Sequence, residues 1–247
     1  MEGSGAPVST RFQPETVAWT REECQIPSIP PSIPMRLVLA TRNPGKVAEL
    51  QARLGPLGVD LVSAADLDAP EVVEDADTLR GNAAKKAHAL SGHAGLPALA
   101  DDTGLEVDAL GGAPGVYSAR FAGPDADDAA NRRRLLTDLG GVAGRAARFR
   151  TVLVFVDGEG QSRAFYGVCE GVITEAEEGD GGFGYDALFR PADGDGRTFA
   201  QMSTAEKNRI SHRGRALDAF VAWLSGKNSP GASLQNRAAR RERGKPV

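Results

Sequence analysis

The sequence predicts an α/β fold in which a mixed sheet is flanked by helices. From residue 36 onward, apolar strand-like runs alternate with segments of helical periodicity, a pattern typical of α/β proteins. Residues 147–156 and 161–173 are β-rich and are separated by Asp-Gly-Glu-Gly, which predicts a hairpin and an antiparallel part of the sheet. With 247 residues, 41% of them hydrophobic, the chain can bury the core that such a fold needs.

The first half of the fold is expected to open as strand, turn and helix. A strand over 36–40 is followed by Asn43 and Pro44, a typical helix N-cap and first helical residue, and by apolar residues at helical spacing. The elements expected next are a strand at 59–63, an acidic loop at 66–77, a helix at 78–90 and a short buried strand at 97–101. That short strand is expected to carry the acids Asp101 and Asp102 at its end.

The second half is expected to combine the hairpin with further helices. A glycine-rich loop over 111–115 precedes a helix expected at 127–139. After the hairpin, Ser203 and Glu206 have the spacing of a capping box and predict the start of a helix. An apolar stripe indicates the final helix and consists of Ala216, Leu217, Phe220, Val221 and Leu224.

The two ends of the chain differ in composition from its centre. Residues 1–34 contain repeated prolines without periodicity, so we expect a flexible extension, and Met35 is a candidate for the true start. Residues 35–226 are expected to form the folded domain, and 227–247 a basic disordered tail. Because cations gather in the tail, the domain is more acidic than the net charge of −4 suggests, which disfavours sequence-independent binding of nucleic acid.

The composition also bears on location. No apolar run reaches the length of a transmembrane helix, and the first 35 residues lack the basic start and apolar centre of a secretory signal. The two cysteines, Cys24 and Cys169, lie far apart and predict neither a disulfide framework nor a thiolate zinc site. We therefore expect a cytoplasmic protein without a membrane partner.

The first candidate site joins the first strand to the first helix. It consists of Thr41, Arg42, Asn43, Pro44, Gly45 and Lys46. The free amides and the positive dipole end of a helix N-terminus attract anions, and a lysine adds charge, so a phosphate group can bind there. The Walker pattern is absent, and an ordinary capped turn explains the same residues.

Two adjacent acids form the second candidate site. Asp101 and Asp102 repel each other, so a divalent cation or a substrate proton would offset their charge. Mg²⁺ is typically bound by one or two carboxylates together with substrate phosphates, which would pair this site with the lysine loop. The alternative is a strand that runs out into an acidic turn.

A glycine-rich loop at 179–186 is the third candidate. It matches G-x-G-x-x-G, but no helical pattern follows, which argues against a dinucleotide-binding unit. The glycines would instead let the backbone approach a flat base that stacks on Phe183 or Tyr185. A plain turn is the alternative.

A cation-rich stretch at 207–214 is the fourth candidate. Lys207 and His212 are five residues apart and would not share a face of one uninterrupted helix. A solvated helix is the usual explanation of such a stretch.

Five motifs follow one another along the chain in a characteristic order. They are T-x-N-x-x-K at 41–46, A-D-D-T-G-L-x-V-D at 100–108, G-G-A-P-G-V-Y-S-A-R at 111–120, G-G-F-G-Y-D at 181–186 and I-S-H-R-G at 210–214. Together they resemble the inosine triphosphate pyrophosphatase family. The resemblance covers about 35–226 and does not extend to the two ends.

The resemblance implies an elongated α/β fold with two lobes around a central nucleotide cleft, in a homodimer. It implies Mg²⁺-dependent hydrolysis of ITP, dITP and XTP to the monophosphate and pyrophosphate. By match of motif, Asp102 is the catalytic proton acceptor and, together with Glu74, a metal ligand. The substrate-binding residues implied by the match are Thr41, Arg42, Asn43, Pro44, Gly45, Lys46, Thr103, Phe183, Gly184, Tyr185, Asp186, Lys207, His212 and Arg213.

Two positions depart from the family pattern. Gly81 stands where many relatives carry a further glutamate, so the metal shell would rest on Glu74, Asp102 and water. Arg42 occupies a position that is often small in relatives. Two other functions stay open at this point: hydrolysis of another altered nucleotide, such as a modified pyrimidine, and nucleotide binding without catalysis.

Overall fold

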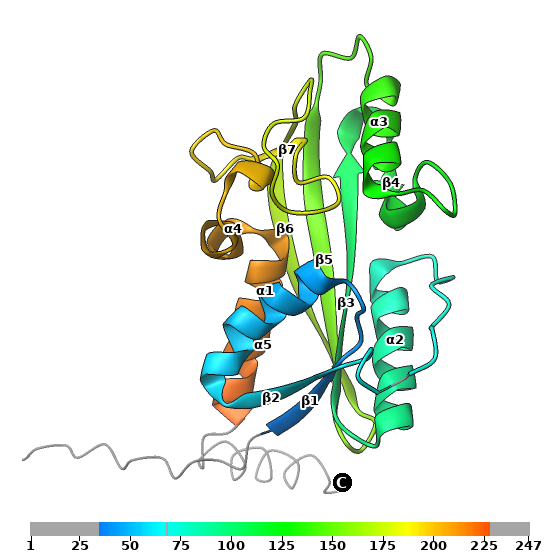
Figure 1. The fold of residues 1–247 in the computed structure, drawn as a ribbon, viewed down its shortest axis with the longest axis vertical. Coiled ribbons are helices and arrows are strands. Elements are labelled where there is room, and N and C mark those ends of the chain that lie inside the picture. The colour runs from blue at the N-terminus through cyan, green and yellow to red at the C-terminus, as the bar shows by residue number, and fades with distance from the viewer. Residues whose placement is uncertain (1–34, 68, 228–247) are drawn as a thin grey trace, which may run out of the picture. The chain divides into compact units, whose positions relative to one another are not determined.

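The computed structural model describes residues 35–67 and 69–227, which form a sheet with helices packed against it (Figure 1). The strands are β1 (Met35–Leu39), β2 (Val59–Ser63), β3 (Ala98–Val107), β4 (Pro114–Gly115), β5 (Ala146–Val156), β6 (Ser162–Ile173) and β7 (Phe189–Pro191). The helices are α1 (Pro44–Leu54), α2 (Leu79–Ala94), α3 (Asp128–Asp138), α4 (Thr204–Ile210) and α5 (His212–Lys227). The expected extension at 1–34 and the tail beyond residue 227 lie outside the described residues.

The sheet is mixed, as the sequence predicts. Its strand order is β2-β1-β3-β5-β6-β7, with β4 paired to β3. β1 runs parallel to both β2 and β3, whereas β3, β5, β6 and β7 pair antiparallel in succession. The predicted hairpin is therefore confirmed as β5 and β6, and the α/β fold with flanking helices is confirmed as well.

Alternation along β1 and the first half of β3 sends successive side chains to cores on opposite faces of the sheet, and Leu105 and Val107 at the end of β3 belong to a third core. Because successive side chains point to opposite faces of a sheet, Leu37 packs toward α1 and α5 while Val38 packs toward α2. In β3 the same rule places Leu99 on the first face and Ala100 on the second. Figure 1 shows α1 and α5 on one side of the sheet and α2 on the other. Complete burial of a leucine or phenylalanine contributes about 1.5–3 kcal/mol, so these three cores together fix the register of β3.

The helix starts follow from local capping chemistry. The Asn43 side chain accepts hydrogen bonds from the first amides of α1, with proline at the first helical position as predicted. Ser203 and Glu206 form the predicted capping box at the start of α4. α2 begins after the N-cap Thr78 but ends later than the predicted residue 90, because the left-handed Gly95 supplies its C-cap.

The prediction for β3 was wrong in its length. β3 has ten residues and pairs with β5 over its whole course, so Asp101 and Asp102 lie in the middle of a strand and not at its end. A residue in the middle of a buried strand usually has apolar neighbours, but Asp101 instead forms buried ion pairs with Lys46 and Arg213. The expected loop at 111–115 also differs, since Pro114 and Gly115 pair with β3 as the short strand β4. Among the described residues no helix is long and apolar enough to span a bilayer.

Candidate active site

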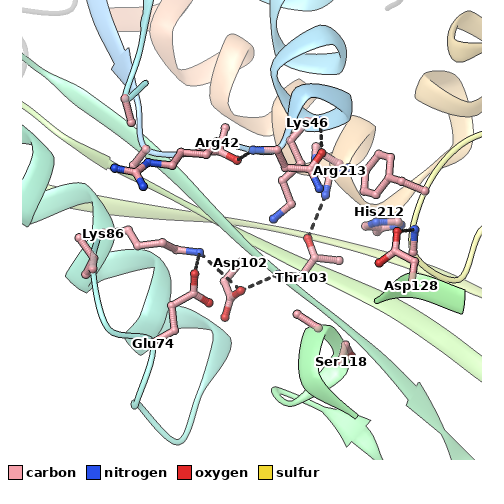
Figure 2. A pocket seen from close by; sticks show the side chains of 18 of the residues that line it. Arg42, Lys46, Glu74, Lys86, Asp102, Thr103, Ser118, Asp128, His212 and Arg213 are labelled. Atoms are coloured by element: carbon pink, nitrogen blue, oxygen red, sulfur yellow. Dashed lines mark hydrogen bonds and ion pairs between the residues drawn. The ribbon is translucent and has the colours of Figure 1, made fainter. Parts of the chain in front are cut away.

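A cavity of about 350 Å³ brings the candidate residues together, a volume typical of small-ligand sites. Its wall combines the start of α1, the acidic loop before α2, the centre of β3, the glycine-rich loop and the junction of α4 and α5 (Figure 2). The candidates that line it are Thr41, Arg42, Asn43, Lys46, Glu74, Asp102, Thr103, Phe183, Gly184, Tyr185, Asp186, Lys207, His212 and Arg213. Pro44 and Gly45 are not part of the lining; a Cβ on Gly45 would lie 2.6 Å from the Phe183 ring.

The two adjacent acids do not share a site. Asp101 points toward α1 and α5, where its Oδ2 lies 3.0 Å from Lys46 Nζ and 3.2 Å from Arg213 Nε. Burial alone would raise the pKa of Asp101, but these two cations outweigh it and hold the pKa well below its usual range. The expectation that a divalent cation or a proton offsets this carboxylate was therefore wrong, because protein cations already do so.

Asp102 faces the opposite side of the sheet, toward α2. Its Oδ2 accepts a hydrogen bond of 3.2 Å from Asn82 Nδ2, and its Oδ1 lies 3.6 Å from Lys86 Nζ. Burial raises the pKa of the Asp102 carboxyl, and Lys86 offsets only part of that rise. A carboxylate with a raised pKa is a stronger base, so Asp102 is suited to accept a proton.

Lys86 was missed in the sequence and joins the two predicted metal ligands. Its Nζ lies 3.0 Å from Glu74 Oε1 as well as 3.6 Å from Asp102 Oδ1 (Figure 2). Burial lowers the pKa of Lys86, but the surrounding carboxylates outweigh it and raise the pKa, which keeps the ammonium charged. The signal that could have found Lys86 is its spacing of four from Asn82, which puts two polar residues on one face of a helix rich in alanine.

The carboxylates of Glu74 and Asp102 fit a hard divalent cation. Both contact the same ammonium group, so they face a common point in the cavity. Mg²⁺ is typically held by one or two carboxylates plus phosphate and water oxygens. No group of three or more potential metal ligands occurs within 35–67 and 69–227, so the remaining ligands of a cation here would be substrate and water.

At Gly81, an added Cβ would lie 2.7 Å from Ala76 Cβ, which accounts for a glycine where helix and loop meet closely.

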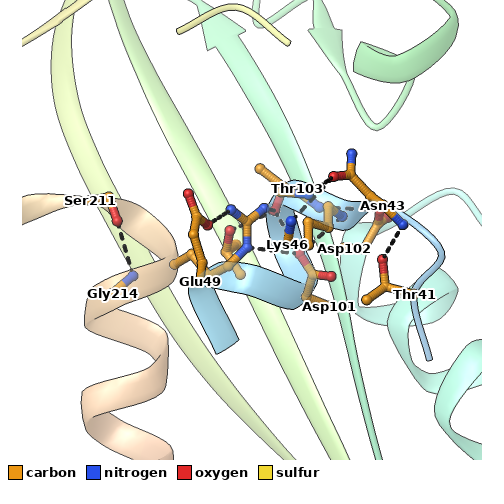
Figure 3. Close-up of polar contacts among 12 residues, drawn as sticks. Thr41, Asn43, Lys46, Glu49, Asp101, Asp102, Thr103, Ser211 and Gly214 are labelled. Carbon is orange, nitrogen blue, oxygen red and sulfur yellow. Dashed lines mark hydrogen bonds and ion pairs between the residues drawn. The ribbon is translucent and has the colours of Figure 1, made fainter. Parts of the chain in front are cut away.

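The loop at the start of α1 is a capped turn that also presents cations to the cavity. Asn43 Oδ1 accepts hydrogen bonds from the amides of Gly45 (2.9 Å) and Lys46 (3.2 Å), so these two amides are already paired (Figure 3). Attraction for an anion therefore rests on the Lys46 ammonium more than on free amides. Burial lowers the pKa of Lys46, although Asp101 opposes this effect. Arg42 donates a 2.5 Å hydrogen bond to the carbonyl of Ala69 and so tethers the acidic loop.

The junction of α4 and α5 brings Lys207 and His212 to the same cavity. The expectation that they lie on different faces assumed one helix, but Ser211 adopts an extended conformation between the two helices. The junction is tight, because a Cβ on Gly214 would collide with the backbone of Asn208. Ser211 Oγ accepts a hydrogen bond from Gly214 N (Figure 3).

Lys207 connects α1 with the glycine-rich loop. Its Nζ lies 2.9 Å from Glu49 Oε1 and 2.7 Å from Asp186 Oδ2, and 4.5 Å from the centre of the Phe183 ring. Asp186 also accepts a hydrogen bond of 2.9 Å from the amide of Phe183. The aromatic loop is thus tied to a buried cation.

Glu49 is a second residue that the sequence analysis missed. It forms ion pairs with both Lys207 and Arg213, and only 4% of its surface is exposed. Burial would raise the pKa of Glu49, but Arg213 and Lys207 outweigh it and keep the carboxylate ionised. Arg213 also donates to Thr103 Oγ1 at 3.2 Å, so the guanidinium links α1, β3 and α5 in the wall of the cavity.

His212 is a buried, neutral side chain in the wall of the cavity. Its ring stacks on Phe149 at 4.5 Å between centroids, and its Nδ1 has no hydrogen-bond partner in the part of the chain that the structure describes. Burial, followed by the charges of Arg213 and Lys207, holds the pKa of His212 well below its usual range. A neutral imidazole can either donate or accept a hydrogen bond.

Comparison with known proteins gives consistent matches over most of the chain. The model of the Ham1 family matches residues 37–223. A dITP/XTP pyrophosphatase of Syntrophobacter fumaroxidans is 52% identical over 196 residues, which cover 76% of this chain and 84% of that protein. Among solved structures, a HAM1 protein from Coxiella burnetii is 37% identical with a TM-score of 0.71, covering 77% of this chain and 98% of its own. A nucleoside-triphosphatase or dITP/XTP pyrophosphatase from Mycobacterium abscessus is 43% identical with a TM-score of 0.61, covering 75% and 98%.

Proposed function

The chain belongs to the Ham1 family, and on that premise we propose that it hydrolyses the altered purine nucleoside triphosphates dITP, ITP and XTP. The products are the nucleoside monophosphate and pyrophosphate. The observation that carries this proposal is one cavity with two chemically different ends. Glu74, Asp102 and Lys86 gather at one end, and Phe183, Lys207 and His212 at the other.

Asp102 is the proton acceptor in this reaction. Its raised pKa makes it a better base than an exposed aspartate, and the hydrogen bond from Asn82 fixes its orientation. A water molecule beside Asp102 can attack the α-phosphorus in line with the departing pyrophosphate. Mg²⁺, bound by Glu74 and Asp102, would supply neutralisation of the phosphate charge.

Cations of the chain carry the triphosphate. Lys46 projects into the cavity from the start of α1, and Lys86 faces it from α2 across β3 (Figure 2). Both can stabilise the charge that develops on the departing pyrophosphate. Arg42 stands at the same wall, where its hydrogen bond to Ala69 leaves other donors of the guanidinium for a phosphate oxygen.

The opposite end selects the base. Hypoxanthine and xanthine carry an oxygen at position 6 that accepts hydrogen bonds, whereas adenine carries an amino group there. A donor from Lys207, His212 or Arg213 pairs with that oxygen, and an unpaired buried polar group costs about 1–3 kcal/mol when adenine is bound. Each nitrogen of Arg213 already donates to a protein oxygen, and Lys207 Nζ is paired with Glu49 and Asp186. His212, whose Nδ1 has no hydrogen-bond partner among the described residues, is therefore the principal donor.

The family resemblance further supports a homodimer in the cytoplasm, where the nucleotide pool is located. The described surface includes the exposed apolar side chains Tyr117, Tyr166 and Val172, which a second copy of the chain can cover. Light scattering coupled to size-exclusion chromatography tests this part: a mass of one chain at micromolar concentration contradicts the dimer.

The test of the function is pyrophosphate release from ITP, XTP, GTP, ATP and dTTP, each with Mg²⁺ and with EDTA. We expect ITP and XTP to be hydrolysed far faster than the other three, and EDTA to stop the reaction. Equal rates for all five nucleotides contradict base selection. Binding of ITP without release of pyrophosphate contradicts catalysis and supports a binding module.

A further inference from the structure

The glycine-rich loop is held by one face of α3, at the edge of the cavity, where Asp128 belongs to the lining and Arg132 does not (Figure 2). Asp128 and Arg132 are four residues apart, so their side chains emerge on the same face of this helix. Asp128 Oδ2 accepts a hydrogen bond of 2.7 Å from the amide of Gly184, and Arg132 Nη1 donates one of 2.9 Å to the carbonyl of Gly184. The two side chains therefore occupy both backbone polar groups of a single residue.

That residue lies between the two aromatic side chains of the loop. Gly184 has a φ of 61°, in the left-handed region, and this turn sends Phe183 and Tyr185 in different directions. Phe183 packs on Lys207, whereas the Tyr185 hydroxyl donates a 2.8 Å hydrogen bond to the carbonyl of Ser118. A shift of Gly184 would consequently move the Phe183 ring, which lines the cavity.

Arg132 also connects the start of the loop segment to α3. Its Nε lies 2.9 Å from Glu177 Oε1, an ion pair whose angle is not that of a hydrogen bond. Arg132 thus contacts the chain both before the loop and at its centre. The packing of α3 against the rest of the protein does not require Asp128 or Arg132, because the buried residues of this helix are Asn131 and Leu135.

We propose that Asp128 and Arg132 are positioning residues that clamp Gly184 and thereby set the place of Phe183 at the base end of the cavity. This inference rests on the proposed function and deepens it by adding residues that act on substrate binding. Because the clamp acts on the base end and not on the proton acceptor, its loss weakens binding and leaves the chemical step nearly intact.

The test compares Asp128→Ala with Asp127→Ala, a matched control in the same helical turn. Asp127 is the N-cap of α3 and bonds to the amide of Ala130, without contact to the glycine-rich loop. We expect Asp128→Ala to raise KM for ITP three- to tenfold with kcat within twofold of wild type. Asp127→Ala lowers the melting temperature and leaves KM unchanged. An equal rise of KM in both variants overturns the proposal, because destabilised α3 would then explain it.

The conservative variant separates positioning from a direct charge effect. Asn at position 128 keeps an oxygen that accepts from Gly184 N but lacks the charge, so we expect Asp128→Asn to retain wild-type KM within twofold. If Asp128→Asn behaves like Asp128→Ala, the carboxylate acts on substrate directly and the positioning role is rejected.

Arg132→Ala is expected to raise KM as well, in contrast to Arg133→Ala, because the Arg133 side chain is exposed. The double variant Asp128→Ala/Arg132→Ala should be less than additive, since both act through one residue.

Hydrogen exchange supplies a readout that does not depend on turnover. We expect faster exchange in the peptide covering 179–188 in Asp128→Ala and Arg132→Ala, but not in Asp127→Ala or Arg133→Ala. Unchanged exchange in both clamp variants overturns the proposal. If the wild-type protein fails to release pyrophosphate from ITP, the proposed function is rejected. Hydrogen exchange and the affinity for ITP, measured by calorimetry, then still test whether Asp128 and Arg132 position Gly184.

Discussion

Replacement of Asp101 or of its neighbour Asp102 by asparagine should have opposite consequences. Asp101 is 2% exposed and its carboxylate contacts both Lys46 and Arg213. Asparagine at this position keeps one oxygen but turns an amide NH₂ toward two cations, which then lie buried without their counter-charge. Asp102 instead carries a charge that burial disfavours, as its raised pKa indicates.

The loss of unfolding free energy expected for each substitution follows from the different surroundings of the two carboxylates. Removing one partner of a buried ion pair typically costs about 3–5 kcal/mol, so we expect Asp101→Asn to lower the free energy of unfolding by that amount. For a chain of this size, the melting temperature should fall by about 10 °C. Asp102→Asn should leave the free energy of unfolding within about 1 kcal/mol of wild type, because it removes a charge whose burial is unfavourable.

Urea unfolding and pyrophosphate release from ITP measure the two effects on the same preparations. Asp102→Asn should abolish pyrophosphate release while it still binds nucleotide, whereas Asp101→Asn should keep measurable activity at a temperature where it is folded. Equal destabilisation by the two substitutions refutes the reasoning, since it would mean that the two carboxylates share one environment. Near-normal turnover of Asp102→Asn refutes its role as proton acceptor.

Three further outcomes are expected. Lys86→Met removes a cation beside Asp102 and so disfavours the ionised form of the Asp102 carboxyl. The acidic limb of the pH–rate profile should therefore move to higher pH. Lys85→Met, which loses only an exposed ion pair with Asp75, should not move it. Gly214→Ala should cost about 1–3 kcal/mol in urea unfolding and raise KM for ITP, because the α4–α5 junction must open; an unchanged KM would show that the junction does not set the site. The pKa of Asp101 in the folded state is lowered, so its carboxylate contributes to stability above the ordinary pKa of 3.8, and this contribution is lost as the pH falls through the folded-state pKa. The difference in unfolding free energy between wild type and Asp101→Asn should therefore shrink as the pH falls below 3.8. A difference that stays constant contradicts the assignment.

Much of the fold is predictable because it depends on local signals. The Asn43 cap, the Ser203 capping box and the β5–β6 hairpin all arise from residues close together in the sequence. The length of β3 is not local in this sense. Its polar centre is stable as a strand only because α1 and α5 supply Lys46 and Arg213 from distant parts of the chain, and no periodicity in β3 itself reports those partners.

The site was predictable to a similar extent. Motifs on loops identified most residues of the cavity wall, since a polar residue on a loop between apolar elements is conspicuous. Glu49 and Lys86 were missed because each is a charged residue within a helix, where a solvated face is the usual explanation. Their burial is a property of the assembled sheet, and the spacing of Lys86 from Asn82 was the only local sign of it.

The alternation of β3 explains how one short segment serves both stability and chemistry. Asp101 and Thr103 point to the face of α1 and α5, where Arg213 contacts both of them and fixes the junction that carries His212. Asp102, between them in sequence, points to the face of α2 and meets Lys86 and Asn82. Because the pleat separates the two sets, the charge of Asp102 can be tuned by burial without loss of the ion pairs that hold the strand in place. A slip of one residue in the β3–β5 register would exchange the two faces and remove the stabilising pairs and the proton acceptor together.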